Sequence, residues 1–231
     1  MEKAKTIKPF SIKDAREVAA KYTSSMGDDF IALDDISLAN LSNDTIRLGF
    51  FTYCFCTGGS VKFMINTQTV EMSSGDLFIG VGDQVFSKLD VSEDFHARMI
   101  LVSHQSIQDG IAGLTQLWPF LQYLYKYPVT HLTLKEQEWA KAGFDYIIWR
   151  MQREETRYRR ETMTALIRLF YFDICDILSF HCMSPVDIRS GSFGLFDKFI
   201  QLLSANFKKE RNVSWYSNKL CITPKYLSEV V

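Results

Sequence analysis

The feature that most constrains this fold is a series of short, strand-like segments, separated by turn-forming residues about every eight to twelve positions. The first, residues 47–56, is rich in β-branched and aromatic side chains and ends at the turn Thr57-Gly58-Gly59. Similar segments follow at residues 61–65, 69–72, 77–81 and 95–102. This spacing is typical of an antiparallel barrel or sandwich, so the sequence predicts a β domain here.

Two short elements are expected before this domain. Ser11 can cap a helix with Asp14 at its third position, and apolar residues then continue at helical spacing to Tyr22. Residues 30–33 are predicted to form a strand.

From about residue 104 the apolar period becomes helical. Thr133 and Glu136 have the spacing of a capping box, which predicts a helix that ends near Arg153. A second helix is expected from about Glu161 to Phe180. Its apolar residues recur at alternating intervals of four and three, the pattern of packed helices, so we expect a dimer interface there. The predicted interface residues are Met163, Ile167, Phe170, Ile174 and Ile177.

The charge is unevenly distributed along the chain. Residues 193–231 carry six Lys and Arg against three Asp and Glu, a net +3, whereas the whole chain has a net charge of −1. A basic segment on an acidic body favours an anionic partner such as nucleic acid. The polar residues 184–192, which contain Pro185 and Gly191, are predicted to be a linker before this segment.

The sequence from Val213 to Val231 has the pattern of a helix-turn-helix. Ser214 is predicted to cap the first helix, and Thr223 followed by Pro224 predicts the start of the second. A generic αα-hairpin is the alternative, because Cys221 stands where Gly is common. The apolar positions of the pattern are Tyr216, Leu220, Ile222, Leu227 and Val230.

The segment Ile222-Thr-Pro-Lys-Tyr-Leu-Ser-Glu-Val-Val231 resembles the second helix of the first helix-turn-helix in the AraC family of bacterial transcription regulators. The segments 58–61 and 74–79 also look like the barrel turns of that family. The resemblance implies an α+β chain, with a cupin-like antiparallel β-barrel, a helical dimerisation element and a partial all-α helix-turn-helix module. It also implies a second motif after Val231, so we expect the chain to end inside its DNA-binding domain.

The expected organisation has five parts. They are an N-terminal arm and helix (1–29), a cupin-like sensor barrel (30–130), a helical dimerisation element (131–183), the linker (184–192) and an incomplete helix-turn-helix domain (193–231).

By this resemblance the protein is a homodimeric regulator that binds promoter DNA and responds to a small-molecule effector in the barrel. The expected DNA-binding residues are Ser214, Thr223, Lys225, Tyr226, Ser228 and Glu229. The expected effector-binding residues are Tyr53, Phe63, Phe78, His96 and Arg98. The alternative is that Phe63 and Phe78 fill the core and that Arg98 is solvated.

Many cupins are metal enzymes, but the residues here do not favour that activity. Counted from Gly75, the metal-ligand positions of the cupin signature carry Val81, Asp83 and either Ser87 or Lys88. We therefore expect no metal, no cofactor and no enzymatic activity. A metal-free cupin enzyme or isomerase with a helical tail is the main alternative, and an interaction module with an empty barrel is another.

The N-terminus lacks the apolar region of a secretory signal, and the apolar stretch 163–180 contains Arg168, Asp173 and Asp176. The five cysteines follow no disulfide framework. The sequence thus predicts a cytoplasmic protein with reduced thiols and no membrane partner.

Overall fold

The computed structural model describes residue 7 and residues 9–18, 23–36, 44–111, 118–153, 157–181, 195, 198–199, 202–203 and 206–230. The predicted linker and most of residues 193–205 lie outside this set. The described residues fall into two compact units. One comprises residues within Met1–Ala112 and Leu124–Tyr171, and the other comprises residues within Gly113–Tyr123 and Phe172–Val231.

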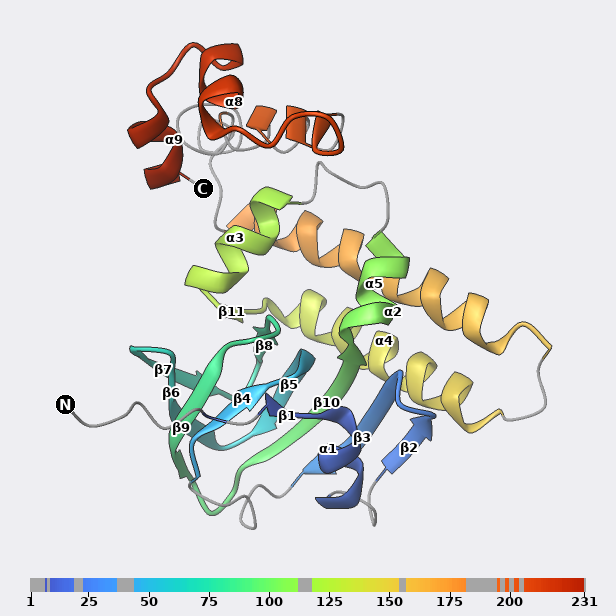
Figure 1. The fold of residues 1–231 in the computed structure, drawn as a ribbon. Coiled ribbons are helices and arrows are strands. Elements are labelled where there is room, and N and C mark those ends of the chain that lie inside the picture. Colours follow the sequence, from blue (N-terminus) through green and yellow to red (C-terminus); the bar gives the residue numbers. More distant parts are fainter. Residues whose placement is uncertain are drawn as a thin grey trace. The chain divides into compact units, whose positions relative to one another are not determined.

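The first unit contains two β-sheets (Figure 1). The five-stranded sheet has the order β1 (Pro9–Phe10), β4 (Ile46–Leu48), β9 (Val85–Val91), β6 (Ser60–Ile65) and β7 (Gln68–Ser73). The six-stranded sheet has the order β11 (Val129–His131), β8 (Asp76–Gly80), β5 (Phe50–Gly58), β10 (His96–Ser103), β3 (Phe30–Ile36) and β2 (Thr23–Met26).

All neighbouring strands are antiparallel except the short pair β1 and β4. The chain is therefore α+β, as expected. The expected closed barrel is wrong, because the strands form two separate sheets.

The predicted strand 47–56 is also divided. Its first residues belong to β4 and the rest to β5, which lie in different sheets. Gly49 lies at the break, where its N–H donates to the Phe10 carbonyl at 2.9 Å. A Cβ at this glycine would lie only 3.1 Å from the same oxygen, so the close approach of the two backbones favours Gly.

Alternation along β5 gives the six-stranded sheet two different faces. Cys54 and Cys56 face a core that contains residues of both sheets. At its centre the Phe63 ring lies 5.3 Å from Phe78 and 5.1 Å from Phe86. The aromatic side chains of this region thus fill the space between the sheets.

The opposite face, with Tyr53 and Phe55, packs against helices. These helices include α4 (Leu134–Gln152) and α5 (Arg159–His181). The Phe55 ring lies 6.4 Å from Phe144 of α4, and the Tyr53 ring lies 5.4 Å from Phe170 of α5. Figure 1 shows α4 running along this face of the sheet.

Local capping fixes where two helices begin. In α1 (Ile12–Val18) the Asp14 carboxylate accepts from the Ser11 N–H at 2.7 Å. In α4 the Thr133 hydroxyl accepts from the Glu136 N–H, and the Glu136 carboxylate accepts from the Thr133 N–H at 2.8 Å. Both capping predictions are confirmed.

The connection from sheet to helices contains α2 (His104–Ile111) and α3 (Trp118–Lys126). No helix among the described residues is long and apolar enough to cross a membrane.

Candidate nucleic-acid interface

The helix-turn-helix pattern folds into α8 (Val213–Lys219) and α9 (Pro224–Val230). α8 begins after Asn212, whose side-chain oxygen accepts from the Ser214 N–H at 2.9 Å. Ser214 was expected to cap this helix, and that expectation is wrong. Asn212 caps as well as a serine does, and it leaves Ser214 inside the first turn.

The turn between the helices depends on Cys221, which has a φ of 57°. The left-handed conformation disfavours residues with a Cβ, which explains why Gly is common in such turns. Two backbone hydrogen bonds close the turn, from Cys221 N to the Asn218 carbonyl at 3.1 Å and from Ile222 N to the Ser217 carbonyl at 3.0 Å. The chain thus makes a tight turn here without glycine.

The second helix begins where the sequence predicts. The Thr223 hydroxyl accepts from the Tyr226 N–H at 3.2 Å, and Pro224 is the first helical residue. This confirms that Thr223 and Pro224 start α9.

A small core joins the two helices. Tyr216 and Leu227 are buried, and Ser217, the small residue of the pattern, has no exposed surface. The Tyr216 hydroxyl donates to the Glu210 carbonyl at 2.7 Å, and the Tyr216 ring lies 5.7 Å from Phe199. Two of the apolar positions, Tyr216 and Leu227, thus pack inward as a helix-turn-helix requires, whereas Leu220 and Ile222 are partly buried and the side chain of Val230 lies outside the described set.

The outer side of this module is polar and basic. Thr223, Lys225 and Ser228 are exposed, and Tyr226 is 45% exposed. The Ser228 hydroxyl donates back to the Pro224 carbonyl at 3.0 Å, so its lone pairs remain available as acceptors. The side chain of Glu229 lies outside the described set.

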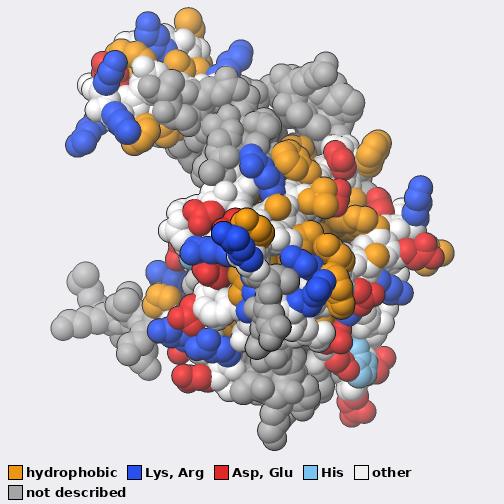
Figure 2. All heavy atoms as spheres, turned by 90° about the vertical axis from the view of Figure 1, so that its right-hand side faces the viewer, with side chains coloured by type: hydrophobic (Ala, Val, Ile, Leu, Met, Phe, Trp, Pro, Cys, Tyr) orange, Lys and Arg blue, Asp and Glu red, His pale blue; other side chains and the backbone are white. Residues whose placement is uncertain are grey.

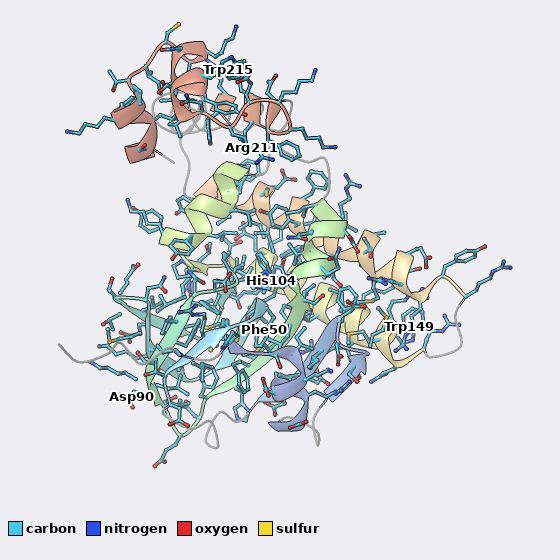
Figure 3. The ribbon with its side chains drawn as sticks, viewed as in Figure 1. Phe50, Asp90, His104, Trp149, Arg211 and Trp215 are labelled. Atoms are coloured by element: carbon cyan, nitrogen blue, oxygen red, sulfur yellow. The ribbon has the colours of Figure 1, made fainter. Side chains whose placement is uncertain are left out.

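Additional exposed or partly exposed groups were not predicted from the sequence. Lys219 lies over the Trp215 ring, 5.5 Å from its centroid, and Arg211 lies just before α8 (Figure 3). The four-residue spacing of Trp215 and Lys219 was the available sequence signal. Among the described side chains, no ion pair engages Arg211, Lys219 or Lys225.

The five residues expected to bind an effector do not meet at one point. Phe63 and Phe78 contact each other between the sheets, whereas Tyr53 faces α5. His96 is exposed, with its Nδ1 3.1 Å from an oxygen of Asp35.

Arg98 bridges two carboxylates. Its guanidinium lies 2.9 Å from Asp34 of β3 and 2.7 Å from Asp145 of α4. Burial alone would lower the pKa of Arg98, but the hydrogen bonds to these carboxylates raise it. Arg98 thus connects the sheet to α4, and its guanidinium is already engaged.

The expected dimer stripe on α5 is largely buried within one chain. Met163, Ile167, Phe170 and Ile174 are buried, and Ile177 is partly buried. Phe170 packs on the rings of Trp139 and Phe144 as well as on Tyr53. Phe170 of the stripe therefore serves intrachain packing in the first unit, whereas Ile174 and Ile177 belong to the second unit.

Asp83, which occupies a metal-ligand position of the cupin signature, lies in a turn with a φ of 69°. Among the described residues, no group of three or more His, Cys, Asp or Glu side chains gathers where it could hold a metal ion.

The four described cysteines are free thiols. Burial raises the pKa of Cys54 and Cys56, and it raises the pKa of Cys175 to about 12. These three thiols therefore stay protonated in the folded chain.

No family model and no curated protein matches the sequence. Among solved structures, the chain is similar to unsaturated fatty acid-bound ToxT from Vibrio cholerae, with 10% identity, a TM-score of 0.39, and coverage of 89% of this chain and 74% of ToxT. It is also similar to the AraC-like transcriptional activator CuxR, with 10% identity, a TM-score of 0.36, and coverage of 87% and 66%.

An oxalate decarboxylase from Bacillus subtilis matches 33% of this chain and 22% of its own, with 11% identity and a TM-score of 0.26. None of these three matches reaches a TM-score of 0.5.

Proposed function

We propose that this protein is a sequence-specific DNA-binding transcription regulator, with α9 as its recognition helix. The observation that carries the proposal is the α8–α9 module. Tyr216 and Leu227 form its interior, and Lys225 and Tyr226 lie on its exposed side. A helix held in this way presents side chains to the major groove.

The exposed residues divide into two chemical groups. Arg211, Lys219 and Lys225 are cations that suit phosphate oxygens, which supply most of the sequence-independent affinity for DNA. Thr223, Tyr226 and Ser228 carry donors and acceptors that suit base edges. Glu229, whose side chain lies outside the described set, is proposed as an acceptor beside them. In this proposal Ser214, at the first turn of α8, adds a phosphate contact.

The first unit is, in the same proposal, the sensor part of the regulator. Thr52 belongs to β5, whose alternate residues Cys54 and Cys56 face the core between the sheets. By the same alternation, Thr52 places a polar group toward that core. Its hydroxyl is buried and has no hydrogen-bond partner among the described residues. Because aromatic side chains fill this core, a small effector would have to displace some of them, and it would then find a hydrogen-bond donor and acceptor at Thr52.

A homodimer is also part of the proposal. On α5, Leu169 is 56% exposed and available for such contacts, whereas Phe170 of the expected stripe is buried within the chain.

The proposal is tested by fluorescence anisotropy of a labelled duplex at low salt. We expect the chain to bind weakly, and we expect the double substitution Lys219→Ala with Lys225→Ala to weaken binding further, by about tenfold or more. Lys62→Ala, an exposed lysine of β6, is the matched control and should leave binding unchanged. Absence of binding, or equal losses for both variants, would contradict the proposal.

A further inference from the structure

The end of α4 carries an exposed cluster of aromatic and arginine side chains that the proposed function does not use. Tyr146 and Trp149 are 48% and 47% exposed. Their rings stack at 5.6 Å, with an interplanar angle of 28°. Figure 3 shows Trp149 near the end of α4.

Guanidinium groups lie over the ring of Trp149. The Arg153 and Arg150 guanidiniums lie 5.0 Å and 5.9 Å from the Trp149 ring centroid. After the connection to α5, the Arg157 guanidinium lies 5.5 Å from the Tyr158 ring. Because a guanidinium is planar, stacking on an aromatic face leaves its N–H donors for a further partner. The aromatic–arginine cluster is defined as Tyr146, Trp149, Arg150, Arg153, Arg157 and Tyr158.

Two neighbouring arginines pair with described residues of the first unit. Arg159 donates to the Met151 carbonyl at the end of α4, and Arg160 lies 3.6 Å from Asp109. Among the described residues, no ion pair involves Arg150, Arg153 or Arg157. The three guanidiniums are thus held in place by rings, and their charge is unmatched by any described carboxylate.

This composition matches that of interaction hot spots, where Trp, Tyr and Arg are enriched. Figure 2 shows hydrophobic side chains beside Lys and Arg on the face of the first unit that α4 and α5 cover. Residues 150–161 contain five arginines against three glutamates, so the local charge is positive.

The contacts that the Trp149 ring already makes within the chain indicate which anionic partner fits. A surface for single-stranded nucleic acid needs open aromatic faces on which bases stack. Here Tyr146 and two guanidiniums of the same helix region already engage Trp149. What remains available is a row of guanidinium donors beside apolar ring edges. Carboxylates accept from such donors in pairs, and neighbouring apolar side chains can pack on the rings.

We propose that this cluster is a docking surface for an acidic protein segment in which Asp or Glu alternate with apolar residues. The surface lies in the first unit and acts independently of the α8–α9 module.

The test is fluorescence anisotropy of a short labelled peptide of alternating Glu and Leu or Phe, titrated with the full chain. We expect binding that weakens about tenfold or more with Arg150→Ala plus Arg153→Ala, because charge-assisted hydrogen bonds are lost. Trp149→Ala should also weaken binding, because both guanidiniums lose their support. Lys141→Ala is the matched control, since it removes an exposed cation from the same helix outside the cluster.

Circular dichroism of each variant checks that the fold is intact. No measurable binding of the peptide, or an equal loss with Lys141→Ala, would overturn the proposal. It would also be overturned if labelled oligothymidylate or anionic lipid vesicles bound more tightly than the peptide in a manner that requires Arg150 and Arg153.

Discussion

The ring of Tyr53 meets the ring of Phe170 edge-on, with centroids 5.4 Å apart and an interplanar angle of 76°. This contact joins the centre of the six-stranded sheet to α5 within a single chain. It explains why Phe170 is 4% exposed, and it makes α5 part of the core of the first unit.

Replacing Phe170 by Ala should therefore reduce the free energy of unfolding by about 3–5 kcal/mol, because a buried aromatic ring is lost and a cavity remains. The neighbouring Leu169→Ala, on the exposed side of the same helix, should change it by less than about 0.5 kcal/mol. Urea unfolding followed by circular dichroism measures both. Equal, small effects would show that the stripe is not an intrachain core.

The buried hydroxyl of Thr52 gives a second stability prediction. Thr52→Val replaces an unpaired polar group by a methyl group of similar size, so it should raise the free energy of unfolding by about 1 kcal/mol. Thr69→Val, at an exposed position of β7, is the control. A loss of stability in Thr52→Val would mean that the hydroxyl is hydrogen-bonded in solution.

Glycine at position 221 should stabilise the turn of the helix-turn-helix. Cys221→Gly removes the cost of a Cβ at a φ of 57° and should stabilise the module by about 1 kcal/mol. Cys221→Val should destabilise it, because β-branched residues tolerate this conformation worst. Thermal unfolding of the two variants measures the difference, and the opposite order would contradict the turn geometry.

The buried thiols predict a pH dependence. Unfolded cysteines lose their protons near about pH 8.5, whereas Cys175 in the folded chain keeps its proton up to about pH 12. Above about pH 8.5 the unfolded state binds fewer protons, so the free energy of unfolding should fall as pH rises, by up to about 1.4 kcal/mol per pH unit and thiol.

Urea unfolding between about pH 7 and about pH 10 tests this, since the loss of stability begins near about pH 8.5, inside that range. The variant with Cys54, Cys56 and Cys175 replaced by Ala should show a flatter profile. An unchanged slope in that variant would assign the effect to other groups.

Structural features that depend on residues close together in the sequence could be predicted, whereas features that depend on distant residues could not. The pairs Ser11 with Asp14 and Thr133 with Glu136 lie three residues apart, so the spacing alone specified both caps. The strand β9 was missed, because polar residues interrupt it and its pairing with β6 shifts register near Lys62. The break at Gly49 depends on Phe10, which is distant in the sequence.

In the candidate sites, too, local patterns were predictable and packing partners were not. Periodicity identified Leu227 and Tyr216 as inward residues of the α8–α9 module, because they contact neighbours a few turns away. It also identified the apolar stripe of α5, but periodicity does not specify whether the partner is another chain or the same one. Asn212 was overlooked as a cap because Ser214 is an equally good capping residue two positions later.

The most direct test of DNA binding through α9 is the salt dependence of duplex binding by the 231-residue chain and by Lys225→Ala, with Lys62→Ala as control. If Lys225 contacts a phosphate, its removal should weaken binding to all sequences and reduce the slope of log K against log salt by about 1. Lys62→Ala should keep the original slope. A slope that is identical in all three proteins would contradict the account, because Lys225 and the exposed side of α9 would then not contact the phosphates.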